Sequence, residues 1–190
     1  MPRSRIVVLM EIALMAALAM LLDWIIPSTH GLKITVKMIP IIVLALRRGL
    51  IPGMAGGFLW GLLQIVTGEA YILNFVQATF EYIVAFTVIG LAGLLYQSFQ
   101  AELKQEARPA KLITYAGLAL LVGSLLRYFC HFIAGIAFWS EYAPEGQSAA
   151  IYSLSVNGTA FLSEMITCLV ALVILLPFYK QLMDPARLSA

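Results

Sequence analysis

Long apolar segments occupy most of this chain, and they restrict it to one kind of fold. Hydrophobic residues make up 62% of the 190 residues, and charged residues only 12%. A mostly apolar segment of about 17–25 residues crosses a bilayer as a helix, because a helix satisfies its backbone hydrogen bonds internally. We therefore predict an all-α integral membrane bundle that forms a single domain over residues 1–190. Its six transmembrane helices are expected at residues 6–26, 34–46, 50–66, 71–96, 112–138 and 149–179.

The positions of lysine and arginine predict how the bundle lies in the membrane. Loops on the cytoplasmic side carry an excess of these residues. Near the ends of the predicted helices, only Lys33 and Lys37 fall on one side of the membrane. Both termini are therefore expected in the cytoplasm, with residues 97–111 as a solvated linker on the same side. The basic residues of this side are Arg3, Arg5, Arg47, Arg48, Lys104, Arg108, Lys111, Lys180 and Arg187.

Several classes of function lack their usual sequence signature here. The net charge is +2 and no basic cluster alternates with exposed aromatic residues, so nucleic acid is not an expected partner. No Walker A pattern occurs, and the chain is therefore not expected to hydrolyse ATP by itself. Cys130 and Cys168 lack the spacing of a zinc site or a redox pair, and no serine or zinc hydrolase signature is present. We expect neither a metal nor a cofactor.

A polar stripe in the fifth predicted helix is the first indication of a functional site. Arg127, His131, Gly135 and Trp139 are spaced four residues apart, so on a helix they share one face. Exposing such groups to lipid is costly. They are therefore expected to face a protein interior or a water-filled cavity.

The fourth and sixth predicted helices bring further polar residues to a similar depth. Counting about 1.5 Å per residue from the outer helix ends places Glu81 and Arg127 about 15 Å deep and His131 about 10 Å deep. Asn74 and Gln77 share a helix face with Glu81. A cavity open to the outside would solvate the whole set. Its candidate residues are Asn74, Gln77, Glu81, Tyr82, Arg127, His131, Trp139, Tyr152 and Asn157.

The chemistry of this set suits a small, flat, nitrogen-rich cation. A carboxylate in a partly apolar pocket favours a cationic guest, because pairing offsets the cost of its own desolvation. Trp139 offers a ring face for stacking or a cation–π contact. Structural interpretations remain open beside this one: Glu81 and Arg127 can form an ion pair, and Trp139 and Tyr152 can belong to the aromatic belt at the outer interface. Glu164 lies deeper, and nothing in the sequence assigns it a role.

Two other functions are compatible with the same residues. A membrane-embedded enzyme could use Glu81 and His131 as an acid–base pair. A solitary cation-coupled carrier of small molecules could use Glu81 as its switch.

Six stretches of the chain together resemble the ThiT (YuaJ) family, the thiamine-binding S components of energy-coupling factor (ECF) vitamin importers. The similarity extends from about residue 11 to residue 177 and is most specific between the fifth and sixth helices. The stretches are EIA at 11–13, LRRG at 46–49, TGEAYIL at 67–73, EY at 81–82, HFIAG at 131–135 followed by WS at 139–140, and YSLSVNG at 152–158.

The resemblance implies a substrate-binding subunit in a prokaryotic plasma membrane that captures thiamine from outside and is not an enzyme. It implies a partner module of one transmembrane T subunit and two cytoplasmic ATPases, with Ala13 and Ala17 on the face that docks the T subunit. Asn74, Gln77 and Arg127 are secondary candidates for ligand contact. The thiamine-binding positions that it implies are Glu81, Tyr82, His131, Gly135, Trp139, Tyr152 and Asn157.

The loop after the first helix departs from the family pattern. Family members can place a second tryptophan there, which closes over the ligand, whereas this chain reads His30-Gly31-Leu32-Lys33. Leu32 is expected to provide apolar cover without ring stacking. The loop composition, with Pro27 and Gly31, is that of a movable lid.

Overall fold

The computed structural model describes residues 3–25, 35–105 and 109–188, and within these ranges every regular element is helical. Four continuous helical segments are long and apolar enough to cross a membrane: Arg5–Ile25, Phe75–Lys104, Pro109–Phe138 and Ala149–Met183. With two shorter helices, α2 (Ile39–Arg48) and α3 (Leu50–Val66), they make the six helices that were predicted. The all-α membrane bundle is confirmed.

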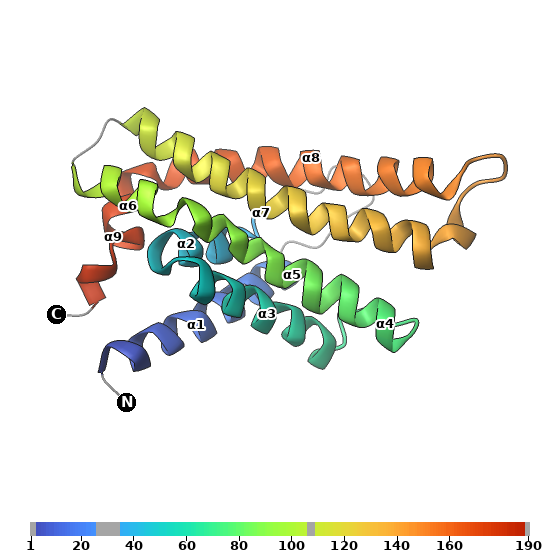
Figure 1. The fold of residues 1–190 in the computed structure, drawn as a ribbon, viewed down its shortest axis with the longest axis horizontal. Helices are drawn as coiled ribbons and strands as arrows, with labels where there is room; N and C mark the ends of the chain where they lie inside the picture. The colour runs from blue at the N-terminus through green and yellow to red at the C-terminus, as the bar shows by residue number, and fades with distance from the viewer. Residues whose placement is uncertain (1–2, 26–34, 106–108, 189–190) are drawn as a thin grey trace.

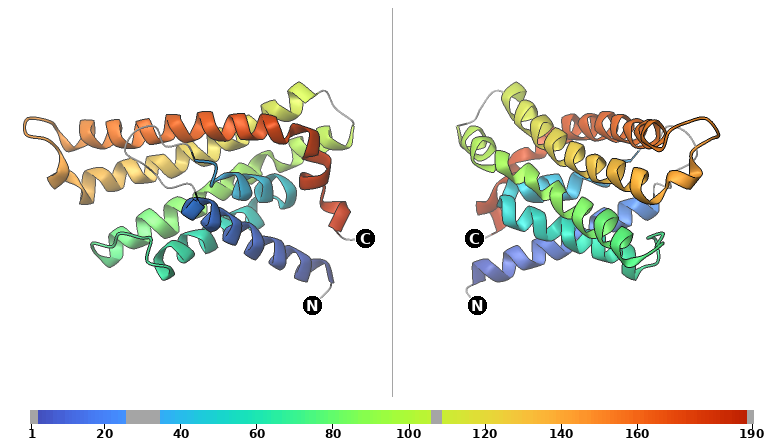
Figure 2. Two further views of the ribbon diagram at one scale, coloured as in Figure 1. Left: turned by 180° about the vertical axis from the view of Figure 1, so that it is seen from behind. Right: turned by 45° about the vertical axis from the view of Figure 1, so that its right-hand side comes forward.

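The two longest helices form one side of the bundle. Helices α7 (Pro109–Phe138) and α8 (Ala149–Leu175) run side by side, and α1 (Arg3–Ile25) lies on the opposite side (Figures 1 and 2). Between them lies α2, in which every residue from Ile39 to Arg47 is buried. A ten-residue helix is only about 15 Å long, so it cannot span the membrane and is instead enclosed by its neighbours.

The start and end of α2 differ from the predicted range of 34–46. Pro40 lies in the first turn, where its missing N–H costs nothing and its fixed φ favours a helix. The helix then continues through Arg47 and Arg48 to Gly49, which has a φ of +89° and ends it. The sixth predicted helix, residues 149–179, is also interrupted. A 3₁₀ turn at Leu176–Phe178 separates α8 from α9 (Tyr179–Met183), and a last 3₁₀ turn covers Pro185–Leu188.

The fourth predicted helix, residues 71–96, is a composite of helix types. It begins at Phe75 rather than Tyr71, because Asn74 adopts an extended conformation and caps it: Asn74 Oδ1 accepts from the Gln77 N–H at 2.9 Å. The order along it is α4 (Phe75–Ala78), a π-helical turn (Thr79–Val84), α5 (Ala85–Thr87), a 3₁₀ segment (Val88–Leu95) and α6 (Tyr96–Lys104).

The prediction of a solvated linker over residues 97–111 is wrong for most of that range. Helix α6 continues to Lys104, and α7 already begins at Pro109. The reason is that Phe99, Gln100 and Leu103 face inward and are buried. Gln100 Nε2 donates to the carbonyls of Leu46 at 2.8 Å and Met183 at 2.7 Å, which ties α6 to the core.

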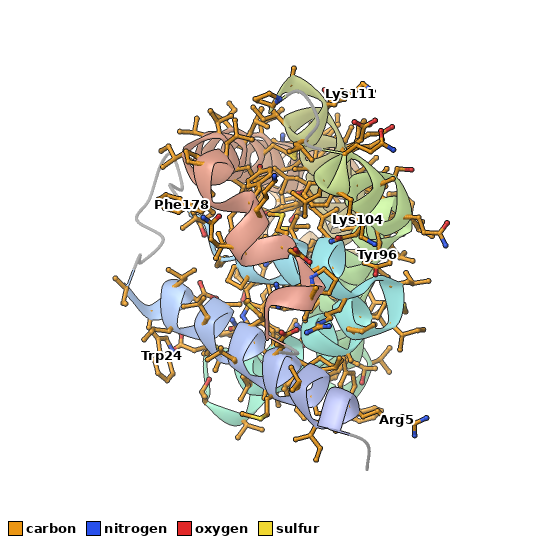
Figure 3. The ribbon with its side chains drawn as sticks, turned by 90° about the vertical axis from the view of Figure 1, so that its left-hand side faces the viewer. Arg5, Trp24, Tyr96, Lys104, Lys111 and Phe178 are labelled. Atoms are coloured by element: carbon orange, nitrogen blue, oxygen red, sulfur yellow. The ribbon has the colours of Figure 1, made fainter. Side chains whose placement is uncertain are left out.

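Both chain termini lie at the same end of the bundle, as predicted from the basic residues (Figure 1). Figure 3 views this end and shows Arg5, Lys104 and Lys111 on α1, α6 and α7. Glu11 there receives hydrogen bonds from Arg47 Nε at 3.1 Å and Arg48 Nη2 at 2.8 Å. The opposite, outer end holds the α3–α4 and α7–α8 connections.

Candidate ligand-binding site

A cavity of about 570 Å³ opens at the outer end, between the start of the composite helix and the outer ends of α7 and α8. Six of the seven primary candidates line it: Glu81, His131, Gly135, Trp139, Tyr152 and Asn157. Three further residues complete the lining, namely Tyr71, Tyr142 and Val156. Its volume is typical of a small-molecule site.

Glu81 is the acidic group of the cavity and is only 8% exposed. It lies in the π-helical turn Thr79–Val84, and such turns occur inside α-helices frequently at functional sites. Its Oε1 accepts from Trp139 Nε1 at 2.9 Å, and its Oε2 accepts from Gln77 Nε2. Both donors are neutral, and within the described ranges no lysine or arginine forms an ion pair with Glu81.

Aromatic rings surround this carboxylate on the outer side. The Trp139 ring lies 5.4 Å from that of Tyr71 and 5.6 Å from that of Tyr142, measured between centroids. The neighbouring Tyr71 side chain raises the pKa of the Tyr142 hydroxyl. A flat cation would meet ring faces here as well as a carboxylate.

The wall of the cavity on the α7–α8 side is built by a close helix contact. Ser153 Oγ donates to the Phe132 carbonyl at 2.8 Å, and a Cβ added at Gly135 would collide with this hydroxyl. Asn157 Nδ2 donates to the carbonyls of His131 at 3.3 Å and Ser153 at 3.1 Å. Among the described residues, the hydrogen bonds that orient Asn157 use its amide nitrogen as the donor.

Tyr82, Asn74 and Gln77 support the site from outside the lining. Tyr82 Oη accepts from the Tyr71 N–H at 2.8 Å, which holds the Tyr71 segment against the composite helix. Gln77 Oε1 accepts from the Leu73 N–H at 3.1 Å, and Gln77 Nε2 also donates to the Tyr71 carbonyl at 3.0 Å. These residues position Tyr71 and Glu81 rather than facing the cavity.

The open interpretation that Glu81 pairs with Arg127 does not hold. Arg127 Nη1 lies 3.2 Å from Glu164 Oε2 instead, and Arg127 is absent from the cavity lining. The reason is geometric: Arg127 is one helical turn deeper than His131, at the level where α8 presents Glu164. The unassigned Glu164 is therefore the counter-ion of Arg127.

Tyr71, Tyr142 and Val156 were missed by sequence reasoning. Val156 follows Tyr152 by four residues and precedes Asn157, so the helix period offered a signal for it. Tyr142 lies outside the long helices, where periodicity says nothing about direction. Tyr71 was predicted as the start of a helix that in fact begins at Phe75, so the predicted period did not apply to it. The predicted cover by Leu32 lies outside the described residues, as do Pro27, Gly31 and Lys33.

Comparison with known proteins identifies the family. A family model described as thiamine transporter protein (Thia_YuaJ) matches residues 9–184. The chain belongs to the Thia_YuaJ family. Thiamine transporter ThiT of Lacticaseibacillus paracasei is 40% identical over 94% of this chain and 91% of its own length. Thiamine transporter ThiT of Bacillus subtilis is 36% identical over 90% and 91%.

A solved structure of a Thia_YuaJ protein agrees with the fold. ThiT from Listeria monocytogenes superposes with a TM-score of 0.89 at 36% identity, covering 95% of this chain and 99% of that chain. As a member of this transporter family, the chain is a multi-pass protein of the cell membrane and not an enzyme. The resemblance noted in the sequence is confirmed, and the acid–base enzyme is excluded.

Proposed function

We propose that this chain captures thiamine from outside the cell and serves as the substrate-binding subunit of an ATP-driven importer. The observation that carries the proposal is the buried Glu81 carboxylate, which receives only neutral hydrogen bonds among the described residues and lies beside the Trp139 ring in an outward-facing cavity. Its relatives named thiamine transporter support the choice of ligand.

Thiamine matches the cavity in charge and shape. Its thiazolium ring carries a permanent positive charge, which the Glu81 carboxylate would neutralise in a site of low dielectric. Its aminopyrimidine is flat and presents donors and acceptors to Asn157, His131 and Tyr152. Stacking on the Trp139 face would add about 0.5–2 kcal/mol.

Thiamine titration of the detergent-purified chain tests this function, with intrinsic tryptophan fluorescence as the readout. Saturable quenching at submicromolar ligand is expected, because Trp139 lies in the cavity. Glu81→Gln keeps the size of the side chain but removes its charge and replaces one acceptor oxygen by a donor, and it should weaken binding by roughly a hundredfold, about 3 kcal/mol. Trp139→Phe keeps a ring but loses the N–H bond to Glu81. If folded wild-type chain shows no response, thiamine is not the ligand.

The partner module is proposed to dock on the exposed face of α1. Ala13 and Ala17 lie one turn apart on this helix, and both are exposed. Small residues let transmembrane helices approach closely, which suits contact with a T subunit. The two ATPases of an energy-coupling factor module would supply the hydrolysis for which this chain has no Walker A pattern.

Bulky substitutions separate binding from transport. Ala13→Phe with Ala17→Phe should leave thiamine affinity unchanged and abolish uptake by cells that contain the complete importer. Leu118→Phe, on the exposed face of α7, is the matched control and should permit uptake. Gradient-driven, ATP-insensitive uptake by proteoliposomes with this chain alone would instead support the solitary carrier.

A further inference from the structure

A buried ion pair lies beneath the cavity, and the proposed function does not use it. Glu164 Oε2 accepts from Arg127 Nη1 at 3.2 Å and from Tyr128 Oη at 2.6 Å. Glu164 is completely buried, and Arg127 is 5% exposed. Burying two charges costs several kcal/mol per ion. Such a pair calls for an explanation beyond the stability of the fold.

The guanidinium group adjoins the inner end of the cavity. Arg127 precedes His131 by one helical turn, and His131 lines the cavity. The Phe86 ring links the two, because its centroid lies 4.6 Å from Arg127 Cζ and 6.4 Å from the His131 ring centroid. Trp60 and Tyr128 also face Arg127, at 5.2 and 5.5 Å. These apolar rings keep water away, so the Arg127 charge acts on the cavity with little screening.

Among the described residues Glu81 is the buried carboxylate that forms no ion pair, whereas Glu69 and Glu141 at the same end are exposed to solvent. Asp23 accepts from Lys37 Nζ at 2.7 Å, and Glu164 neutralises Arg127. Among the described residues Glu81 receives hydrogen bonds only from Gln77 and Trp139. Without Glu164, the uncompensated positive charge of Arg127 would offset part of the negative charge of Glu81, and the cavity would favour a cation less strongly.

We propose that Glu164 determines the charge specificity of the site by neutralising Arg127. It is a positioning residue that does not contact the ligand, and its effect is to leave the Glu81 carboxylate free to select a cation over a neutral molecule of the same shape. This inference rests on the proposed thiamine-binding function. At an effective dielectric of about 20, a unit charge about 10 Å away changes the affinity for a cation by roughly tenfold.

Two ligands that differ only in charge test the inference. Thiamine is the cation, and an analogue with a neutral thiophene ring in place of the thiazolium is its isostere. Glu164→Gln should lower the thiamine affinity, relative to that of the analogue, by roughly tenfold, because it exposes the cavity to an uncompensated cation. A merely structural role would weaken both ligands equally and leave the ratio unchanged. Titration calorimetry gives both affinities.

Three further variants complete the test. Arg127→Gln with Glu164→Gln removes both charges and should restore the wild-type ratio. Glu102→Gln removes a carboxylate at the cytoplasmic end, where it pairs with Lys111, and should leave the ratio unchanged. Should Glu164→Gln fail to fold, Arg127→Gln keeps the Tyr128 hydrogen bond to Glu164 and should raise the ratio instead.

The outcomes separate the inference from the function on which it rests. The inference is supported if the ratio of thiamine to analogue affinity falls in Glu164→Gln, or rises in Arg127→Gln. In either case the ratio should return to the wild-type value in the double variant. An unchanged ratio in whichever single variant folds overturns it. Failure of the wild-type chain to bind thiamine would instead overturn the proposed function, and this measurement comes first.

Discussion

At the scale of single residues, the cavity depends on one point where two helices nearly touch. Ser153 is only 2% exposed, and its hydroxyl both donates to the Phe132 carbonyl and accepts from Asn157 Nδ2 at 3.2 Å. This network needs the absence of a side chain at Gly135. Gly135 therefore has two roles: it lines the cavity, and it allows α8 to approach α7 closely enough to orient Asn157.

Gly135→Ala should reduce both stability and thiamine affinity. The added methyl group would overlap Ser153 Oγ and Cβ, and such overpacking costs about 1–3 kcal/mol. If half of that cost falls on the bound geometry, the thiamine affinity drops by about two- to tenfold. Thermal unfolding and thiamine titration measure the two effects. Gly158→Ala is the control, because the nearest atom to its new Cβ would be Leu154 Cδ1 at 4.0 Å; equal behaviour of the two variants would contradict the prediction.

At the scale of elements, the composite helix Phe75–Lys104 positions the acidic group of the site. Its π-helical turn carries Glu81, and its 3₁₀ segment Val88–Leu95 packs closely on α3. A 3₁₀ stretch of eight residues is unusually long, since the hydrogen-bond geometry is poorer than in an α-helix. Close contact with α3 supplies the stabilisation that the local geometry lacks. Gly90 lies at this contact, where an added Cβ would meet the backbone of Gly53 and Met54.

Gly90→Ala should destabilise the protein by several kcal/mol. A Cβ at this position would overlap the backbone nitrogen of Met54, and a backbone atom cannot rotate away as a side chain does. The cost should exceed the usual overpacking cost of about 1–3 kcal/mol, because that value applies where flexible neighbouring side chains can move aside. Gly117→Ala on α7 is the control, with its nearest contact at an ordinary 3.5 Å from Leu169 Cδ1. It should be neutral or stabilising by up to about 1 kcal/mol, through helix propensity. Thermal unfolding in detergent compares the stability of the Gly90→Ala and Gly117→Ala variants.

At the scale of the whole molecule, two polar clusters lie at opposite ends of the bundle. The outer cluster is the cavity. The cytoplasmic one joins α1, α2 and the C-terminal segment, since Arg47 contacts both Glu11 and the carbonyl of Leu182, the latter at 3.0 Å. The two clusters share no residue. Ligand capture and attachment of α1 are therefore expected to respond to mutation independently.

Glu11→Gln should lower stability without changing ligand affinity. It leaves the buried Arg47 without its carboxylate, and breaking such a pair costs about 3 kcal/mol or more. Thiamine affinity of the folded protein should stay within about twofold, because distant sites behave additively. A Lys111→Gln variant, which removes an exposed pair, should cost less than about 1 kcal/mol. A large loss of thiamine affinity in Glu11→Gln would show that the two ends are coupled.

Much of this architecture could be predicted because its causes are local. Apolar length alone predicts membrane helices, since lipid offers the backbone no hydrogen bonds. The helix period places His131, Gly135 and Trp139 on one face, and the structure indeed brings them into one cavity. The polarity of His131 and Trp139 excludes the lipid side. The outer position of the site was predictable from the lysine and arginine distribution and from depth counted along the helices.

Other features depend on how helices meet, and only the tertiary structure decided them. The sequence offered Glu81 as a partner for Arg127 and gave Glu164 no role, whereas the packing of α7 against α8 pairs Arg127 with Glu164. Tyr71 and Tyr142 line the cavity from segments that lie outside the long helices in the structure, and the predicted helix start at Tyr71 hid this for one of them. The π-helical turn at Glu81 is also absent from any local pattern. In each case the deciding free energy comes from contacts between segments that are apart in the sequence. Composition and residue spacing do not predict such contacts.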